Sequence, residues 1–339
     1  MPLRNIIGHR KLVALLSRSI ARDTLPPSLI LSGPVGVGKR LAALATAQTL
    51  NCLNPARSPA TDGPADAIVH DACGTCAACT RIARGVHPDV SILEPNDKGN
   101  IRIDPVRDLI DRAGYRPFEG RRRVAIVDQA DALEPGAQNA LLKVLEEPPS
   151  GSVFLLVTAY PDLLLPTVRS RCPQLRFRPL SPGEVAAALQ ASGRSEVEAH
   201  AVAALADGSI GRALEATAGE LVEARDVAMR VLDAAALSAD PRRRMDSAKE
   251  LVDNGAERDQ LATYLRAMAS LLRDVEALAA SADHGVLANP DLVSRLERLR
   301  PPFAGDRARQ AFQAIDSALV ALERYTNTKL VADWLVLQL

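Results

Sequence analysis

The chain has 339 residues, more than one ordinary hydrophobic core can use, so two or three domains are expected. Its 41 Lys and Arg residues balance its 41 Asp and Glu residues, and this zero net charge argues against extensive DNA wrapping by the chain alone. No apolar run approaches the roughly 20 residues that cross a bilayer. The first residues lack the apolar core of a secretory signal. We therefore expect a soluble, cytoplasmic protein without a membrane partner.

Short apolar segments alternate with helical patterns in the first half of the chain, as a parallel α/β sheet requires. Each expected strand is short and buried, and together they cover 28–31, 90–93, 123–127 and 153–157, with the exit from the sheet at 176–179. Helical patterns cover 41–50 and 135–147. The segment 55–67 is rich in Pro, Ala and Asp, which predicts a flexible insertion.

From residue 180 onward the sequence is almost entirely helical in period. This part begins with Ser181-Pro182-Gly183-Glu184, in which Ser can cap a helix and Glu stands three residues after the cap. A basic, proline-containing link near 239–244 divides the helices. We expect an α/β domain at 1–179, a small helical domain at about 180–240 and a second helical domain at about 245–339.

A glycine-rich loop directly follows the first expected strand. Gly33, Gly36 and Gly38 precede Lys39, and a helical pattern begins beyond it. In this context backbone N–H groups and the helix N-terminus can surround phosphate oxygens, while Lys39 adds a positive charge. A glycine turn that only permits tight packing would explain the glycines but not Lys39. The loop therefore predicts phosphate binding, with ATP or ADP as the ligand to test.

Two positions near this loop lack groups that nucleotide hydrolysis normally uses. Arg40 stands where a hydrolysing loop has Ser or Thr as a Mg²⁺ ligand, and a guanidinium offers no lone pair to a metal. Asp128 stands where a metal-coordinating acid would be, but Gln129 follows it in place of the Glu that polarises the attacking water. Loss of a general base typically costs ~10²–10⁴ in rate. Hydrolysis is therefore not expected, unless residues elsewhere compensate.

Four of the five cysteines are closely spaced, at Cys52, Cys73, Cys76 and Cys79. Thiols stay reduced in the cytosol, so this spacing indicates a metal before a disulfide. Four thiolates complete a closed tetrahedral site, which makes the predicted zinc structural. A redox Cys-x-x-Cys would leave two cysteines unexplained. His87 is near enough in sequence to replace one ligand, although it leads into a strand and is expected to be structural.

Further candidate residues flank the strand expected at 153–157. Thr158, at its end, can hydrogen-bond a phosphate region or simply cap the strand. Arg171 lies in the loop beyond and, taken alone, would be a solvated arginine. Glu146 and Glu147 end the preceding helix, where acids oppose the helix dipole. A partner arginine or backbone amide would explain these two acids, and a solvated helix end is the alternative.

Three sequence motifs resemble those of bacterial clamp-loader ATPase subunits of the AAA+ class. They are NALLKVLEEPP at 139–149, Ser170-Arg171-Cys172, and GSIGRA at 208–213, and the four-cysteine insertion is also typical of this family. The resemblance spans about the first 215 residues and weakens beyond, where only Asn327 matches. It implies an AAA+ P-loop sheet domain with a zinc module at about 52–79, then a small helical lid domain and a C-terminal helical collar that oligomerises.

Two kinds of subunit within this family resemble the chain. The motor kind (gamma/tau) keeps a complete P-loop and an acidic pair for hydrolysis, whereas the delta-prime kind has degraded nucleotide motifs but keeps the Ser-Arg-Cys arginine. Arg40 and Gln129 match the second kind. The resemblance implies that Arg171 is an arginine finger acting in trans on ATP held by a neighbouring subunit. It also implies that Thr158 and Arg212 are sensor residues.

The function implied by the resemblance is that of a non-hydrolysing subunit of the DNA polymerase III holoenzyme. Its partners would be delta and gamma/tau subunits in a pentameric ring that loads the sliding clamp on primed DNA. The alternative is an ATP-hydrolysing motor subunit of the gamma/tau type. An independent zinc-bearing DNA-binding module is a third possibility, and the neutral charge and an aromatic content of 3% argue against it.

Overall fold

The computed structural model of the chain has two compact units, Met1–Leu180 and Ser181–Leu339. The residues it describes are 2–59, 68–206, 208–215, 218–237, 240–252, 258–280, 287, 289, 292–303, 305–323 and 326–339. Among the helices in these ranges, none combines the length and the apolar character needed to cross a membrane.

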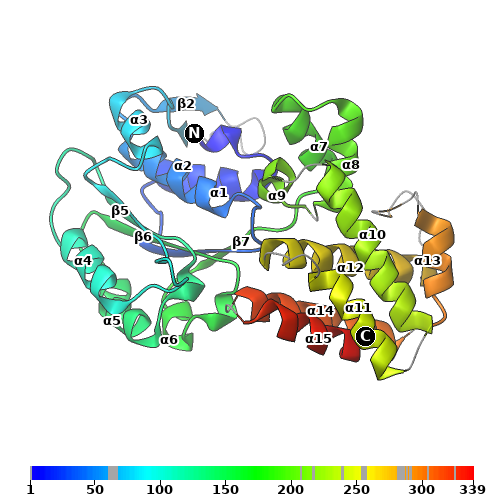
Figure 1. Ribbon diagram of the computed structural model, residues 1–339. Helices are drawn as coiled ribbons and strands as arrows, with labels where there is room; N and C mark the ends of the chain where they lie inside the picture. The colour runs from blue at the N-terminus through cyan, green and yellow to red at the C-terminus, as the bar shows by residue number, and fades with distance from the viewer. Residues whose placement is uncertain are drawn as a thin grey trace. The chain divides into compact units, whose positions relative to one another are not determined.

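One sheet of parallel strands forms the centre of the described part of the first unit (Figure 1). Its strand order is β4 (Val90–Leu93), β5 (Arg123–Val127), β6 (Ser152–Thr158), β1 (Ser28–Ser32) and β7 (Gln174–Arg176). The strands predicted at 90–93 and 123–127 have the predicted bounds, and the two others are longer by one residue at one or both ends. The predicted exit at 176–179 begins inside β7, because Arg176 still pairs with Ser32 of β1.

Helices cover both faces of this sheet. Leu29 and Leu31 of β1 pack in a cluster with side chains of α1 (Arg10–Ala21) and α2 (Lys39–Asn51). Ile30, between them, faces the opposite cluster, which includes α4 (Ile103–Ala113), α5 (Pro135–Glu146) and α6 (Pro166–Arg169). Figure 1 shows these two groups of helices on opposite sides of the strands. Burial on both faces explains why the inner strands β1, β5 and β6 are mainly apolar runs rather than alternating ones.

A small antiparallel pair of strands, β2 (Ala56–Pro59) and β3 (Ile68–Asp71), follows α2. The prediction of a flexible insertion at 55–67 is wrong for 56–59, which pair with β3, and 60–67 lie outside the described residues. The physical reason is that β3 is fixed to α1. Ser17 Oγ donates to the His70 carbonyl at 2.8 Å and accepts from the His70 N–H at 2.9 Å. Strand β2 therefore has a rigid partner.

Short elements complete the part of the first unit that the structure describes. They are η1 (Leu3–Asn5), α3 (Ala77–Ala83), η2 (Ala130–Ala132) and η3 (Pro161–Leu163).

Most of the described residues of the second unit lie in helices, as the period of the sequence predicts. The helices are α7 (Pro182–Ala191), α8 (Glu196–Leu205), α9 (Ile210–Glu215), α10 (Ala218–Leu237), α11 (Pro241–Val252), α12 (Arg258–Ala279), α13 (Val293–Leu299), α14 (Asp306–Glu323) and α15 (Thr328–Gln338). The predicted helix start is confirmed, because Ser181 and Glu184 form a reciprocal capping box at the N-terminus of α7. Asn327 caps α15 through a hydrogen bond from the Leu330 N–H to its Oδ1 at 3.2 Å.

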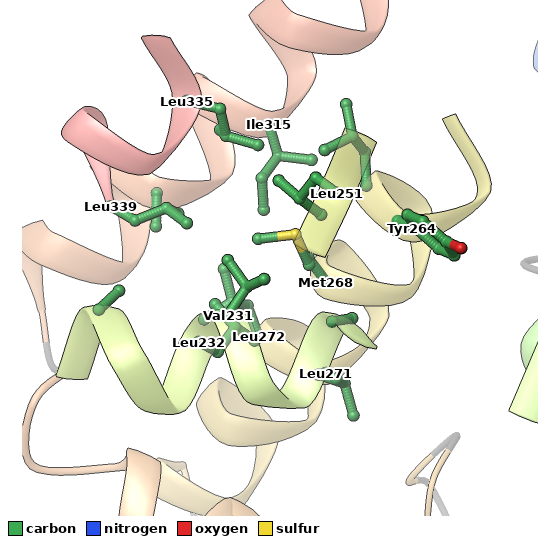
Figure 2. Packing of buried hydrophobic residues seen from close by; sticks show 14 of the residues in the cluster. Val231, Leu232, Leu251, Tyr264, Met268, Leu271, Leu272, Ile315, Leu335 and Leu339 are labelled. Atoms are coloured by element: carbon green, nitrogen blue, oxygen red, sulfur yellow. The ribbon is translucent and has the colours of Figure 1, made fainter. Parts of the chain in front are cut away.

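Most of these helices share one hydrophobic core. Figure 2 shows Val231 of α10, Leu251 of α11, Met268 of α12, Ile315 of α14 and Leu335 of α15 converging on it. Side chains from both sides of the predicted boundary at about 240 thus pack together. The division of this unit into a lid and a collar stays a prediction.

Candidate functional site

The glycine-rich loop connects β1 to α2 at the carboxyl end of β1, where ligands of parallel α/β sheets usually bind. Gly33, Gly36 and Gly38 have φ angles of +143°, +76° and +98°, a region that side-chain-bearing residues rarely adopt. A Cβ built on Gly33 would lie 2.3 Å from the carbonyl oxygen of Phe177. The loop therefore depends on glycine for its backbone angles and, at Gly33, also for space.

Replacing Gly33 with alanine should lower the free energy of unfolding by about 2–5 kcal/mol, because backbone strain adds to a steric clash with Phe177. Gly38→Ala is the matched control. Gly38 also has a positive φ, but a Cβ there meets no atom within 4 Å, so only the strain of about 1–3 kcal/mol applies. Urea unfolding measures both values. Equal losses in the two variants would contradict the proposed clash.

Lys39 begins α2 and is 7% exposed. Its Nζ donates to the carbonyl oxygens of Gly33 and Pro34, both at 2.6 Å. The ammonium group is therefore held at the glycine loop itself. This position gives the loop the positive charge that the sequence predicts.

Arg40 turns toward two carboxylates beyond the loop. Its Nη1 lies 2.9 Å from Asp128 Oδ2 and also contacts Glu94 Oε1. Asp128 Oδ1 accepts from the N–H of Gln129 at 3.0 Å. Both oxygens of the acid predicted to coordinate a metal are therefore bound to groups of the protein.

Glu94 was not identified from the sequence. It directly follows β4, the neighbour of β5, and the carboxyl ends of parallel strands meet at one edge of a sheet. An acid after each of two strands was therefore the available signal. The strand order, which the sequence alone does not reveal, was needed to use it.

Thr158 ends β6 and is 1% exposed. Its Oγ1 donates to Asp131 Oδ1 at 2.5 Å and accepts from the Tyr160 N–H at 3.0 Å. The main-chain carbonyl of Thr158 accepts from the Gly33 N–H at 3.3 Å, which ties the end of β6 to the glycine loop. The hydroxyl thus caps the strand end, and its predicted role as a nucleotide sensor stays a prediction.

Arg171 follows α6 and forms an ion pair with Glu146, at 3.3 Å between Nη2 and Oε1. Its Nη1 also donates to the Thr167 carbonyl at 3.0 Å. The expectation that a partner arginine explains the acidic end of α5 is confirmed for Glu146. The side chain of Arg171 is 31% exposed, so its neighbours orient the guanidinium without enclosing it.

Arg212 belongs to α9 of the second unit. Its backbone N–H donates to the hydroxyl of Ser209, a buried residue that precedes α9, at 3.2 Å. The predicted reach of Arg212 toward the nucleotide pocket stays a prediction.

The predicted cysteine ligands lie together. The Sγ atoms of Cys52, Cys73, Cys76 and Cys79 are all within 4.8 Å of one another, and those of Cys52 and Cys76 are 4.0 Å apart. A tetrahedral zinc site with Zn–S bonds of about 2.3 Å separates its sulfurs by about 3.8 Å. The four thiols could therefore hold a metal ion with only small movements.

Hydrogen bonds around the cluster favour thiolate ligands. The Cys73 N–H donates to Cys52 Sγ at 3.2 Å, and the Cys76 N–H donates to Cys73 Sγ at 3.3 Å. A backbone hydrogen bond from Thr75, with that from Cys76, lowers the pKa of Cys73 to about 6. Burial instead raises the pKa of Cys52 and Cys79. A metal cation would compensate this burial by stabilising the thiolate form.

His87 is outside the cysteine cluster. It is 4% exposed, its Nδ1 accepts from the Asp89 N–H at 3.1 Å, and its Nε2 lies 3.3 Å from Glu119 Oε1. Burial lowers the pKa of this imidazole below its ordinary value of 6.5, against the opposing charges of Glu119 and Asp89. The imidazole of His87 is therefore buried and contacted by neighbouring residues, which fits the structural role expected for it.

Stability should fall as the pH drops through and below 6.5, because unfolded His87 takes up a proton that the folded chain binds more weakly. His87→Asn removes the titrating group and keeps an acceptor for the Asp89 N–H. Urea unfolding on both sides of pH 6.5 should show a weaker pH dependence in this variant than in the wild type. The same dependence in both proteins would contradict the assignment.

The sequence matches a known family, described as DNA polymerase III, delta subunit, over residues 8–181. The delta' subunit of DNA polymerase III from Pseudomonas aeruginosa is 40% identical over 162 residues, which are 48% of this chain and 46% of that protein. The Bacillus subtilis delta' subunit is 33% identical over 172 residues, or 51% of this chain and 48% of that protein. The gamma/tau subunit from Mycobacterium tuberculosis is 34% identical over 185 residues, or 54% of this chain and 30% of that protein. The chain thus matches about half or less of the length of these curated relatives.

Proposed function

Because the chain belongs to the DNA polymerase III delta-subunit family, we propose that it is a clamp-loader subunit of the delta-prime type that does not hydrolyse ATP. Its proposed partners are delta and gamma/tau subunits in a pentameric ring, which places the sliding clamp on primed DNA during replication in the cytoplasm. Within that ring, Arg171 acts in trans as an arginine finger on ATP bound by a neighbouring subunit.

The contact between Arg40 and Asp128 carries the non-hydrolysing part of this proposal. A hydrolysing P-loop holds Mg²⁺ between a Ser or Thr hydroxyl and an acid at the end of a neighbouring strand. Here the first group is an arginine, and the acid is bound to it at 2.9 Å. Gln129, next in the chain, cannot accept a proton from water. The site thus lacks the hydroxyl ligand for the metal, and it lacks the general base of the usual reaction.

The environment of Arg171 supports the finger. An arginine that stabilises a transferring phosphoryl group must be exposed and correctly oriented before the neighbour's ATP arrives. The ion pair with Glu146 and the hydrogen bond to Thr167 orient the guanidinium, and 31% of the side chain remains exposed. An arginine held in this way loses less side-chain freedom when it meets a phosphate.

We assign the rest of the chain as follows. Residues 1–179 are the AAA+ P-loop domain, with a structural zinc ion held by the four cysteines of a module at about 52–79. Gly33, Gly36, Gly38 and Lys39 surround phosphate, and Thr158 and Arg212 are sensor residues. Residues 180–240 are the lid, and residues 245–339 are the oligomerising collar. Closed coordination by four cysteines leaves no open position for a reaction at the metal.

An ATP-hydrolysing motor subunit is the second candidate function. It is favoured by the 34% identity to a gamma/tau subunit over 185 residues and by the complete glycine frame with Lys39. It requires that Arg40 and Gln129 be tolerated in a working site.

Steady-state ATP hydrolysis by the purified chain alone separates the two functions. We expect no turnover above the protein-free rate, because the loss of a base alone costs ~10²–10⁴. A gamma/tau subunit assayed under the same conditions is the positive control. Clear turnover that disappears in Lys39→Ala would contradict the non-hydrolysing function and favour the motor.

A further inference from the structure

We propose that the glycine loop of this chain binds a nucleoside diphosphate or triphosphate without a divalent cation, and that Arg40 supplies the positive charge in place of the metal. This inference deepens the proposed function and rests on it. It concerns whether this chain binds its nucleotide with or without Mg²⁺, whereas the arginine finger acts at the neighbouring subunit's site.

The two acids beside the loop, Glu94 and Asp128, already bind protein groups through oxygen atoms that a metal would need. Mg²⁺ requires near-ideal octahedral coordination by oxygen atoms. Asp128 uses one oxygen for Arg40 and the other for the Gln129 N–H, and Glu94 contacts the same guanidinium nitrogen of Arg40. A metal ion would have to break these contacts and then lie beside a fixed cation.

Four charged side chains directly follow the glycine loop, β4 and β5, and their charges balance. Lys39 and Arg40 contribute two positive charges, and Glu94 and Asp128 contribute two negative charges, so their sum is zero. With a hydroxyl residue at position 40 the sum would be negative by one charge and would attract a cation. Arg40 therefore cancels the excess negative charge with which these side chains would attract a metal, while the phosphate side of the site keeps its positive groups.

The groups that would meet phosphate are in place. The glycine loop has the positive φ angles described above, and α2 begins at Lys39 with Gly38 as its N-cap. The N-terminus of a helix of this length favours an anion. Lys39 Nζ lies at the loop carbonyls, where a bound phosphate oxygen can share it.

Arg40 keeps donors that can bind phosphate while it contacts the acids. Among the described residues, its contacts to Asp128 and Glu94 both use Nη1, so they leave Nε and Nη2 as donors. A guanidinium has five N–H donors in one plane and can bind carboxylate and phosphate oxygens at the same time. About half of the side chain is exposed, at 49%, so a ligand can approach it.

The test is calorimetric titration of the full-length chain with ADP and with ATP, in magnesium-free buffer and again with excess Mg²⁺. No chelator is added, because a chelator would also remove a metal from the cysteine cluster. For the wild type we expect affinities that differ by less than about threefold between the two buffers. Lys39→Ala should bind more weakly in both buffers, because it removes a charge that does not depend on the metal.

Arg40→Thr restores a hydroxyl ligand and frees both acids. We expect its affinity for nucleotide to rise by about tenfold or more when Mg²⁺ is added. Arg40→Lys is the matched variant, since it keeps the charge but has a single nitrogen in place of the planar fork. It should bind more weakly than the wild type and remain insensitive to Mg²⁺. Thermal unfolding of each variant identifies any that fails to fold.

Two outcomes overturn the inference. One is a wild-type affinity that rises about tenfold or more with Mg²⁺. The other is no nucleotide binding in either buffer, which would indicate that Arg40 blocks the site. Neither outcome affects the proposed clamp-loader function, because Arg171 acts on ATP held by another subunit. Reconstituted clamp loading therefore tests that function separately.

Discussion

Replacing Arg171 with alanine should lower ATP hydrolysis at the neighbouring subunit's site by ~10³–10⁵, in a loader reconstituted from this chain and its proposed partners. The physical reason is that a guanidinium beside the γ-phosphate stabilises the charge that develops in the transition state. Single-turnover hydrolysis on primed DNA with the sliding clamp measures the chemical step. Clamp loading should fall with it.

Arg169→Ala is the matched control for this experiment. Arg169 is an exposed arginine that ends α6 two residues earlier and forms an ion pair with Asp162 at 2.5 Å. Its loss removes the same charge from the same segment and should leave hydrolysis near the wild-type rate. Arg171→Lys should remain strongly impaired, because one ammonium group cannot replace a planar fork. An unchanged rate for Arg171→Ala in a fully assembled loader would reject the finger.

Replacing Cys79 with serine should release the proposed zinc ion and lower the free energy of unfolding by about 4 kcal/mol or more, as loss of a structural metal can. Cys79 is fully buried beside Cys52, so removal of the metal leaves a buried hydroxyl among three thiols. Metal analysis of the purified chain measures zinc content, and urea unfolding measures stability. The wild type should contain one zinc ion per chain.

Cys172→Ala is the matched control. Cys172 is also buried, and burial raises its pKa to about 11, but it packs in the core on one face of the sheet and lies outside the cluster. Its replacement should keep the full zinc content and cost roughly 1 kcal/mol for the lost sulfur. Full zinc content and wild-type stability in Cys79→Ser would contradict a four-cysteine site.

Much of the first unit, and the helix start that opens the second unit, could be predicted because the signals are local. The strands at Val90–Leu93 and Arg123–Val127 are short, mainly apolar runs flanked by charged residues. The capping box of Ser181 and Glu184 lies within four consecutive residues. The spacing of the cysteines also indicated the cluster that the fold assembles.

The features that could not be predicted depend on contacts distant in sequence. Glu94 and Asp131 look like ordinary loop acids until the strand order brings them beside Arg40 and Thr158. Strand β2 forms on a partner that is fixed from α1, far earlier in the chain. In the second unit, helical period predicts the helices but not that α10 shares a core with the helices beyond residue 240.

The hydrogen bonds of Asp71 to the start of the chain have a consequence for chain entropy. Asp71 accepts from the Leu3 N–H at 2.8 Å and the Arg4 N–H at 3.1 Å, and Leu3 lies 68 residues earlier in sequence. These contacts close a loop of the chain that contains β1, the glycine loop and α2. Closing a loop of this length is opposed by an entropy that grows only with the logarithm of the number of residues. Cys73 lies two residues after Asp71. A metal ion bound to Cys73 would restrict the position of Asp71 and so help to keep this loop of the chain closed, although the ion touches no nucleotide.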